Sequence, residues 1–264
     1  MGAFIHPQAI VQPGAELGDN IEIGPFCTIG PKVRLGDGVR LVSHVSIAGS
    51  TTIGPRTVVS PFVALGHPPQ DTKFKGEDTR LIIGADNLLR EHVTMHLGTV
   101  QGRGETRIGD RGFFMAGAHV GHDCIVGDNV VFANNATLGG LVVIGDFVTL
   151  GGLSAVHQLG RVGRYAFVGG GAPLVGDVIP FGMADNHGRL HGLNLIGLKR
   201  RGFKRDTINT LRAVYRELFL GQGHFEDRLA MVGERHGGVP EVAEILDFIQ
   251  AGEKRPLCLP VMEG

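Results

Sequence analysis

Two histidines and an aspartate in the segment AHVGHDCIVGDN are the residues whose types and spacing best suit chemistry. His119 and His122 lie three residues apart, and Asp123 follows His122 directly. A histidine can remove the proton of an attacking hydroxyl group, and an adjacent carboxylate can fix the tautomer of the imidazole. A backbone amide beside the histidine can stabilise the oxyanion that forms. The segment therefore predicts general-base catalysis of acyl transfer, with His122 as the base.

A large apolar side chain recurs at every sixth residue and defines the elements that must position these groups. The hexads run through residues 5–65, resume in phase at 83–95, and continue in a shifted phase through 108–174. In the last range, a small or β-branched residue follows four positions after each large one. Three hexads form one coil of a three-sided parallel β-helix, and stacked coils share one core because a single coil buries little surface. The pattern therefore predicts an all-β fold, a parallel β-helix of hexapeptide repeats.

The 18-residue period of such a coil predicts which residues stack beside the histidine. Gly140 and Gln158 fall in the same column as His122, on strands about 4.8 Å apart. His157 falls in the column of Gly139, and Leu141 in that of Asp123. The inward positions of this hexad belong to Val120 and Cys124, so we expect His119, His122 and Asp123 on the outer side of the coil.

Two pauses in the hexads and a change of pattern near residue 190 predict the organisation of the chain. We expect inserted loops near 66–80 and 98–105 within a β-helix of residues 1–190, followed by a C-terminal helical domain of residues 191–264. The segment RDTINTLRAVYRELFLG has helical spacing, with Asp206 or Thr207 as its N-cap and Gly221 at its end. Two further helices are expected in HFEDRLAMVGERHGG and VPEVAEILDFIQAG, the last with Pro240 in its first turn.

Composition excludes several classes of function. The formal net charge is −1, which provides no global field for nucleic acid. No apolar run approaches the roughly 18 residues of a membrane span, and the N-terminal segment does not resemble a signal peptide. Three cysteines without a C-x-x-C pair favour a reduced, cytoplasmic protein. The close histidine pairs are four and three residues apart, which fits a three-histidine zinc site poorly, so no metal is expected.

Six segments resemble the UDP-N-acetylglucosamine O-acyltransferase family of lipid A synthesis: IGPFCTIGP, QDTKFKGEDTR, AHVGHDCIVGDN, ANNATLGG, AVHQLG and GLKRRGF. The resemblance covers nearly the whole chain. It implies a left-handed coil and a homotrimer with active sites between neighbouring subunits. It also implies transfer of a 3-hydroxyacyl chain from acyl carrier protein to the 3-hydroxyl of UDP-N-acetylglucosamine, without a cofactor.

Matching motifs imply a role for individual residues. His122 would be the general base, Asp123 would orient it, and the Gly140 amide would stabilise the oxyanion. A glycine at position 170 would leave the acyl channel open, which implies a longer hydroxyacyl chain. The positions implied to meet the substrates are Gln70, Asp71, Lys73, His96, His119, His157, Gln158, Gly170, His187, Asn194 and Arg200.

Basic residues cluster after the β-helix in a chain that is otherwise slightly acidic. A solvated helix face is one interpretation. The other is a docking surface for an acidic carrier protein, whose encounter the charge would accelerate. The residues expected to bind the carrier protein are Arg201, Lys204, Arg205, Arg212 and Arg216.

Three departures from the family pattern leave the acceptor open. Leu141 stands where well-known members have a histidine, Ile196 where a glutamate is common, and Leu97 where an arginine is common. The sequence favours a hydroxyl acceptor, and a 3-amino sugar nucleotide is the alternative. A sugar acetyltransferase of the same fold, a β-helical carbonic anhydrase with bound metal, and a scaffold that does not need His122 are the rival classes.

Overall fold

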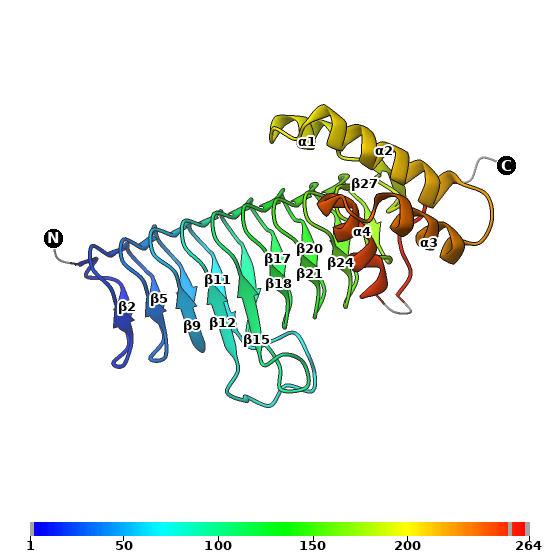
Figure 1. Ribbon diagram of the computed structural model, residues 1–264. Coiled ribbons are helices and arrows are strands. Elements are labelled where there is room, and N and C mark those ends of the chain that lie inside the picture. The colour runs from blue at the N-terminus through cyan, green and yellow to red at the C-terminus, as the bar shows by residue number, and fades with distance from the viewer. Residues whose placement is uncertain (1–2, 253–254, 262–264) are drawn as a thin grey trace.

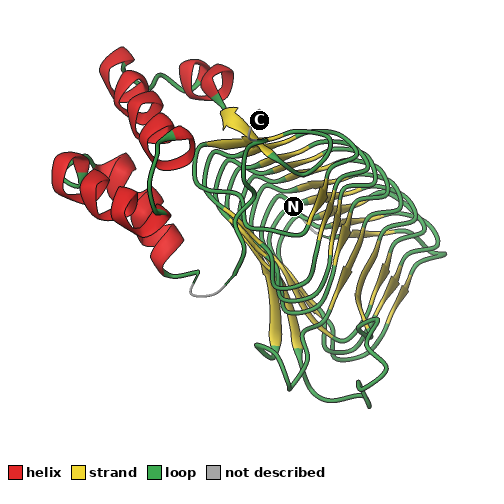
Figure 2. Cartoon of the chain, turned by 90° about the vertical axis from the view of Figure 1, so that its right-hand side faces the viewer, coloured by secondary structure: helices red, strands yellow, loops and turns green. Residues whose placement is uncertain are grey.

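The computed structural model describes residues 3–252 and 255–261 as a parallel β-helix with helices at its C-terminal end (Figure 1). Viewed near the coil axis, the chain turns around three sides, and the helices lie beside the last coils (Figure 2). Successive strands pass through three sheets, here called A, B and C, and each strand of a regular coil pairs in parallel with the strand three positions later in the chain.

The three sheets contain all the strands of the described residues. Sheet A contains β1 (Phe4–Ile5), β4 (Glu22–Ile23), β7 (Arg40–Leu41), β10 (Val58–Val59), β13 (Leu88–Leu89), β16 (Phe113–Phe114), β19 (Val131–Phe132), β22 (Thr149–Leu150), β25 (Phe167–Val168), β27 (Gly182–Ala184) and β28 (Leu190–Leu193). Sheet B contains β2 (Ile10–Val11), β5 (Thr28–Ile29), β8 (Ser46–Ile47), β11 (Ala64–His67), β14 (Thr94–His96), β17 (His119–Val120), β20 (Thr137–Leu138), β23 (Ala155–Val156) and β26 (Pro173–Leu174). Sheet C contains β3 (Glu16–Leu17), β6 (Arg34–Leu35), β9 (Ser50–Ile53), β12 (Arg80–Ile83), β15 (Glu105–Ile108), β18 (Ile125–Val126), β21 (Val143–Ile144) and β24 (Arg161–Val162).

The register of the sheets follows the hexads. His119 pairs with Thr137 and Thr137 with Ala155, which is the 18-residue step expected from the sequence. The step lengthens where Val58 pairs with Leu88, because the loop 68–79 is inserted between β11 and β12. A second loop, 97–104, is inserted between β14 and β15. Both loops therefore leave the coil at the corner between sheets B and C, and both project from the same edge in Figure 1.

The interior contains the large and small residues that the hexads predict. Phe114 and Phe132 are fully buried as large inward residues, and Ala118 and Cys124 are fully buried as small ones. Removing such side chains from water is the main source of stability for a fold in which each coil contacts only its neighbours. Asp123 and Leu141 occupy the same corner on adjacent coils, both in the left-handed backbone region, with φ of 59° and 65°.

Four helices follow the coil: α1 (Leu195–Arg200), α2 (Arg205–Leu220), α3 (Phe225–His236) and α4 (Pro240–Gln250). The short helix α1 was not expected from the sequence. The predicted N-cap of α2 was wrong: Lys204 occupies that position without a side-chain cap, and Asp206 lies in the first turn, where a negative charge is favourable near the helix dipole. The end of α2 at Gly221 and the position of Pro240 at the start of α4 are confirmed.

A buried ion pair ties the end of the chain to the last coil. The carboxylate of Asp177 is fully buried and accepts hydrogen bonds from Arg161 Nε at 2.7 Å and Arg255 Nε at 3.1 Å. The backbone amide of Asp177 donates to the carbonyl of Pro256, and that of Cys258 donates to the carbonyl of Asp177, each at 2.8 Å. Within the part of the chain that the structure describes, no helix has the length and apolarity to cross a membrane.

Candidate active site

His122 and Asp123 form a hydrogen-bonded dyad at the corner between sheets B and C. His122 Nδ1 lies 2.8 Å from Asp123 Oδ2, and the histidine side chain is 19% exposed. Because an ionised carboxylate only accepts hydrogen bonds, this contact places the proton of the neutral imidazole on Nδ1. The lone pair of Nε2 is then available to accept a proton from a ligand.

Asp123 lies outside the core of the coil, as expected, but it does not lie on the surface. Its side chain is fully buried because the inserted loop 97–104 covers it. The carboxylate accepts the Thr99 hydroxyl at 2.7 Å and the Arg103 backbone N–H at 2.7 Å, and both of its oxygens lie within 3.1 Å of the Thr99 backbone N. Burial acts to raise the pKa of Asp123, but the Thr99 hydroxyl and amide, His122 and the Arg103 amide together hold it below its usual value.

Gly140 lies one coil further along, directly against the imidazole. A Cβ atom added to Gly140 would stand 2.4 Å from His122 Nε2 and 2.5 Å from Cε1. Among the hydrogen bonds made within residues 3–252 and 255–261, none uses the Gly140 N–H. A base and a free backbone donor therefore lie side by side, which is the arrangement required to deprotonate a nucleophile and to stabilise an oxyanion.

Two further predicted histidines lie on the preceding strands of sheet B. The rings of His96 and His119 are edge to face, with centroids 5.1 Å apart, and His119 Nδ1 lies 2.7 Å from the Thr94 hydroxyl. Burial, and then the neighbouring histidines, lower the pKa of His96 to about 4, so its ring is neutral near pH 7. Burial also lowers the pKa of His119. Among the described residues, His96 Nδ1 is one of three buried side-chain N or O atoms without a hydrogen-bond partner.

His157 and Gln158 lie two coils after the dyad, in the columns that the period predicts. Both are exposed, and His157 Nδ1 lies 3.2 Å from the Gln158 carbonyl. Gln70, Asp71 and Lys73 lie on the loop 68–79, where Asp71 Oδ1 accepts the backbone N–H of Lys73 at 2.9 Å. These three side chains make no hydrogen bond or ion pair to the dyad among the described contacts.

Asn194 and Arg200 lie on a different side of the molecule from the dyad. They line a pocket of about 810 Å³ over sheet A, together with Phe147, Thr149 and Phe167. The side chain of Asn194 caps α1 by accepting the Gly197 N–H at 3.0 Å and donates to the Tyr165 carbonyl at 2.9 Å. Asn194 therefore has a structural role in addition to any contact with a ligand.

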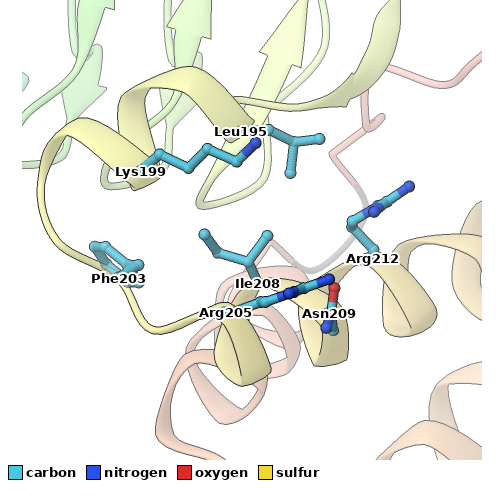
Figure 3. A pocket seen from close by; sticks show the side chains of 7 residues that line it. All are labelled: Leu195, Lys199, Phe203, Arg205, Ile208, Asn209 and Arg212. Carbon is cyan, nitrogen blue, oxygen red and sulfur yellow. The ribbon is translucent and has the colours of Figure 1, made fainter.

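Arg201 differs from the other basic residues of its cluster. Its guanidinium lies over the Phe147 ring, 4.3 Å from the centroid, within the same pocket as Arg200. Arg205 and Arg212 instead line a groove of about 440 Å³ between α1 and α2, which Figure 3 shows with Lys199 on its opposite side. Arg216 lines a neighbouring pocket, and Lys204 is exposed just before α2.

The two residues expected near the acyl chain lie close to the last coils. Gly170 is exposed at the corner after β25, where an added Cβ would meet the Gly152 carbonyl oxygen at 3.3 Å. His187 is exposed in the turn between β27 and β28, and its backbone N–H donates to Asp185 at 2.8 Å.

The three departures from the family pattern occupy different environments. Leu97 is 6% exposed and belongs to the apolar core, where its side chain would lie 2.8 Å from a Cβ added to Gly49. Leu141 follows Gly140 at the corner, and its carbonyl accepts Arg103 Nη1 at 3.2 Å. Ile196 is 67% exposed beside Asn194 in the pocket over sheet A.

Sequence reasoning missed Thr99, Arg103 and Thr106, which surround Asp123. Thr106 Oγ1 accepts the Asp123 backbone N–H at 2.8 Å, and Arg103 Nη1 donates to the Asp123 carbonyl. The available signal was the pause at 98–105, because this insertion lies one coil before the dyad and at the same corner of the coil. In the described ranges, no group of three or more histidine, cysteine, aspartate or glutamate side chains is arranged to hold a metal ion.

Comparisons with known proteins agree with this geometry. The family described as UDP-N-acetylglucosamine O-acyltransferase, domain 2, matches residues 177–258, and the bacterial transferase hexapeptide family matches residues 105–140. The acyl-[acyl-carrier-protein]–UDP-N-acetylglucosamine O-acyltransferase of Burkholderia mallei is 48% identical over 255 residues, covering 95% of this chain and 97% of the relative. The chain belongs to this acyltransferase family.

The acyltransferase is also similar to relatives in other bacteria. The Caulobacter vibrioides protein of the same name is 57% identical over 203 residues, which cover 76% of this chain and 77% of the relative. The solved O-acyltransferase of Moraxella catarrhalis has a TM-score of 0.93 at 40% identity, covering 96% of this chain and 99% of that structure. The fold expected for the acyltransferase, a left-handed parallel β-helix followed by a small helical segment, is confirmed.

Proposed function

We propose that the dyad catalyses transfer of a 3-hydroxyacyl chain from acyl carrier protein to the 3-hydroxyl of UDP-N-acetylglucosamine, the first step of lipid A biosynthesis. Relatives up to 57% identical are named for this O-acyl transfer, which supports the hydroxyl acceptor over the amino sugar. The observation that carries the proposal is the placement of His122 Nε2 against Gly140 while Nδ1 is held by a buried carboxylate.

In this mechanism His122 Nε2 takes the proton of the sugar hydroxyl as the oxygen attacks the thioester carbonyl. The Gly140 N–H stabilises the negative charge on the carbonyl oxygen of the tetrahedral intermediate. When the carbon–sulfur bond breaks, the proton on His122 passes to the leaving thiolate of the carrier protein. Asp123 stabilises the transient imidazolium and keeps Nε2 directed at the substrate.

We also propose that a complete site requires a second copy of the chain. The dyad lies at the corner between sheets B and C, whereas Arg200 lines the pocket over sheet A. A homotrimer would bring the sheet-A pocket of one subunit against the dyad of its neighbour. We expect each of the variants His122→Ala and Arg200→Ala to be inactive alone, and the co-expressed chains to recover part of the activity in mixed trimers.

The remaining predicted residues extend this proposal to the two substrates. Gly170 and His187 would line the acyl channel, and Gln70, Asp71 and Lys73 would meet the substrate from the first inserted loop. The groove between α1 and α2 has three cationic side chains, Lys199, Arg205 and Arg212, around an apolar floor, which suits an acidic carrier protein (Figure 3).

A product assay by mass spectrometry tests the function. Hydroxyacyl carrier proteins of several lengths are supplied with UDP-N-acetylglucosamine or with its 3-amino analogue. We expect an ester product with long chains, its loss in His122→Ala, and full activity in His92→Ala, whose exposed ring stacks on Phe62 at another corner. An ester formed equally well by His122→Ala contradicts the mechanism, and a product only from the amino analogue contradicts the acceptor.

A further inference from the structure

The corner occupied by Asp123 departs from the regular coil. At the next two coils the corner residue pairs with backbone one coil earlier: the Leu141 N–H donates to the His122 carbonyl at 2.8 Å, and the Leu159 N–H to the Gly140 carbonyl at 2.9 Å. One coil before Asp123, the loop 97–104 takes the place of the regular corner that would supply the partner carbonyl. The Asp123 N–H therefore donates to the Thr106 hydroxyl instead of to a carbonyl.

The loop that replaces the corner is built around the Asp123 carboxylate. Three groups from this loop donate to it: the Thr99 hydroxyl at 2.7 Å, the Thr99 amide at 3.0 Å and the Arg103 amide at 2.7 Å. His122 Nδ1 completes the set at 2.8 Å. A carboxylate that accepts several N–H and O–H donors stays ionised although it is buried.

The loop holds these donors in a closed turn. The Thr99 hydroxyl accepts the Gly102 N–H at 3.1 Å, and the Thr99 carbonyl accepts the Gly104 N–H at 2.9 Å. Thr99 is 2% exposed, and a Cβ added to Gly102 would lie 2.3 Å from Asp123 Oδ2. The hydroxyl of Thr99 thus uses both its donor and its acceptor, and Gly102 lets the backbone approach the carboxylate closely.

We propose that Thr99 is a positioning residue of the acyltransferase, whose hydroxyl and amide clamp Asp123 in the ionised state and in the orientation that directs His122 at the substrate. The clamp assigns a function to the second insertion, which otherwise only interrupts the coil. It rests on the proposed role of His122 as the general base.

The clamp predicts a specific effect on the pH dependence of catalysis. Without the Thr99 hydroxyl, the carboxylate charge loses one donor, so the dyad holds an added proton more tightly and becomes a free base only at higher pH. The other titratable or charged groups around the dyad, His119 and His96 on sheet B and the Arg103 guanidinium on the loop, stay in place. A hydroxyl that only stabilises the fold would not produce this shift.

The test compares Thr99→Val, which keeps the shape but loses the hydroxyl, with Thr99→Ser, which keeps the hydroxyl. The pH profile of kcat/KM is measured on the intact oligomer with acyl carrier protein and UDP-N-acetylglucosamine. We expect the acidic limb of Thr99→Val to move up by about one pH unit and kcat to fall by about tenfold. Thr99→Ser should restore the wild-type profile.

The outcomes separate the clamp from the proposed function. An unshifted acidic limb in folded Thr99→Val, with His122→Ala inactive, overturns the clamp and leaves the base intact. Full activity of His122→Ala in the same assay overturns both. If Thr99→Val does not fold, Thr99→Ala takes its place, because it also removes the hydroxyl and should move the limb in the same direction.

Discussion

A single methyl group at Gly140 should disable catalysis without unfolding the coil. The backbone of Gly140 does not have positive φ, so alanine is compatible with its conformation. The new Cβ would, however, stand 2.4 Å from His122 Nε2 and 2.5 Å from Cε1. An ordinary contact between such atoms is about 3.5 Å, so the imidazole must withdraw by about 1 Å.

This displacement sets the expected magnitude. A reacting group misplaced by about 1 Å costs roughly 10²-fold in rate, and complete loss of a general base costs up to about 10⁴-fold. We therefore expect kcat of Gly140→Ala to fall by at least about 10²-fold, or about 2.7 kcal/mol of transition-state stabilisation. The KM values should change much less, because the methyl group meets the base and leaves the binding loops untouched.

The assay is steady-state kinetics of purified Gly140→Ala, with its melting temperature and oligomeric state measured alongside. Gly233→Ala is the matched control, because its added Cβ would have only Leu246 Cδ1 nearby, at 3.8 Å, far from the dyad on helix α3. A kcat for Gly140→Ala within about threefold of wild type would refute the placement of the base against this glycine.

Two further predictions concern charge. The double variant Arg205→Glu/Arg212→Glu should raise KM for the acyl carrier protein by about tenfold at low salt, with little change in kcat. The control Arg40→Glu, near the opposite end of the coil, should leave this KM unchanged. An equal rise of KM in the double variant and in the control would contradict docking in the groove between α1 and α2. The lowered pKa of His96, about 4 against about 6.5 in an unfolded chain, means that the unfolded state binds a proton first as the pH falls. The stability that comes from the neutral His96 ring should be complete above pH 6.5 and should decline between pH 6.5 and 4, by about 2 kcal/mol at pH 5. Urea denaturation of wild type and His96→Gln at pH 7.5 and 5 measures this decline. Identical pH dependence of the unfolding free energy in the two proteins would contradict its attribution to His96.

The sequence predicts the coil well because its pattern reports burial directly. Every sixth residue from Ile108 to Leu174 is buried in the core, and the 18-residue step from His119 to Thr137 follows from three hexads. The helix α1 was missed because it is held by the side chain of Asn194 against the carbonyl of Tyr165, a tertiary contact that leaves no periodic signal in six residues. The beginning of α2 was misplaced because Lys204 precedes it without a side-chain cap.

The candidate site was predicted only in part, for a related reason. The period alone places His122 beside Gly140 and Asp123 beside Leu141, since both pairs follow from stacking. The hexapeptide pattern makes no prediction for residues 97–104, which form the irregular loop that supplies the donors to Asp123. The burial of Asp123 could therefore not be derived, because it depends on a turn closed by the Thr99 hydroxyl and the Gly102 amide.

The constant register of the sheets also governs how this chain can reach its fold. Parallel pairing usually joins distant parts of a sequence and makes folding slow, but here partners such as His119 and Thr137 are only 18 residues apart. That separation is about 0.07 of the chain length, a value more typical of helical bundles. Each completed coil can template the next, so folding can spread in either direction from any early turn. Thr99 and Asp123 are separated by only 24 residues, so the Asp123 carboxylate can be enclosed as soon as two coils have formed, long before the chain is complete.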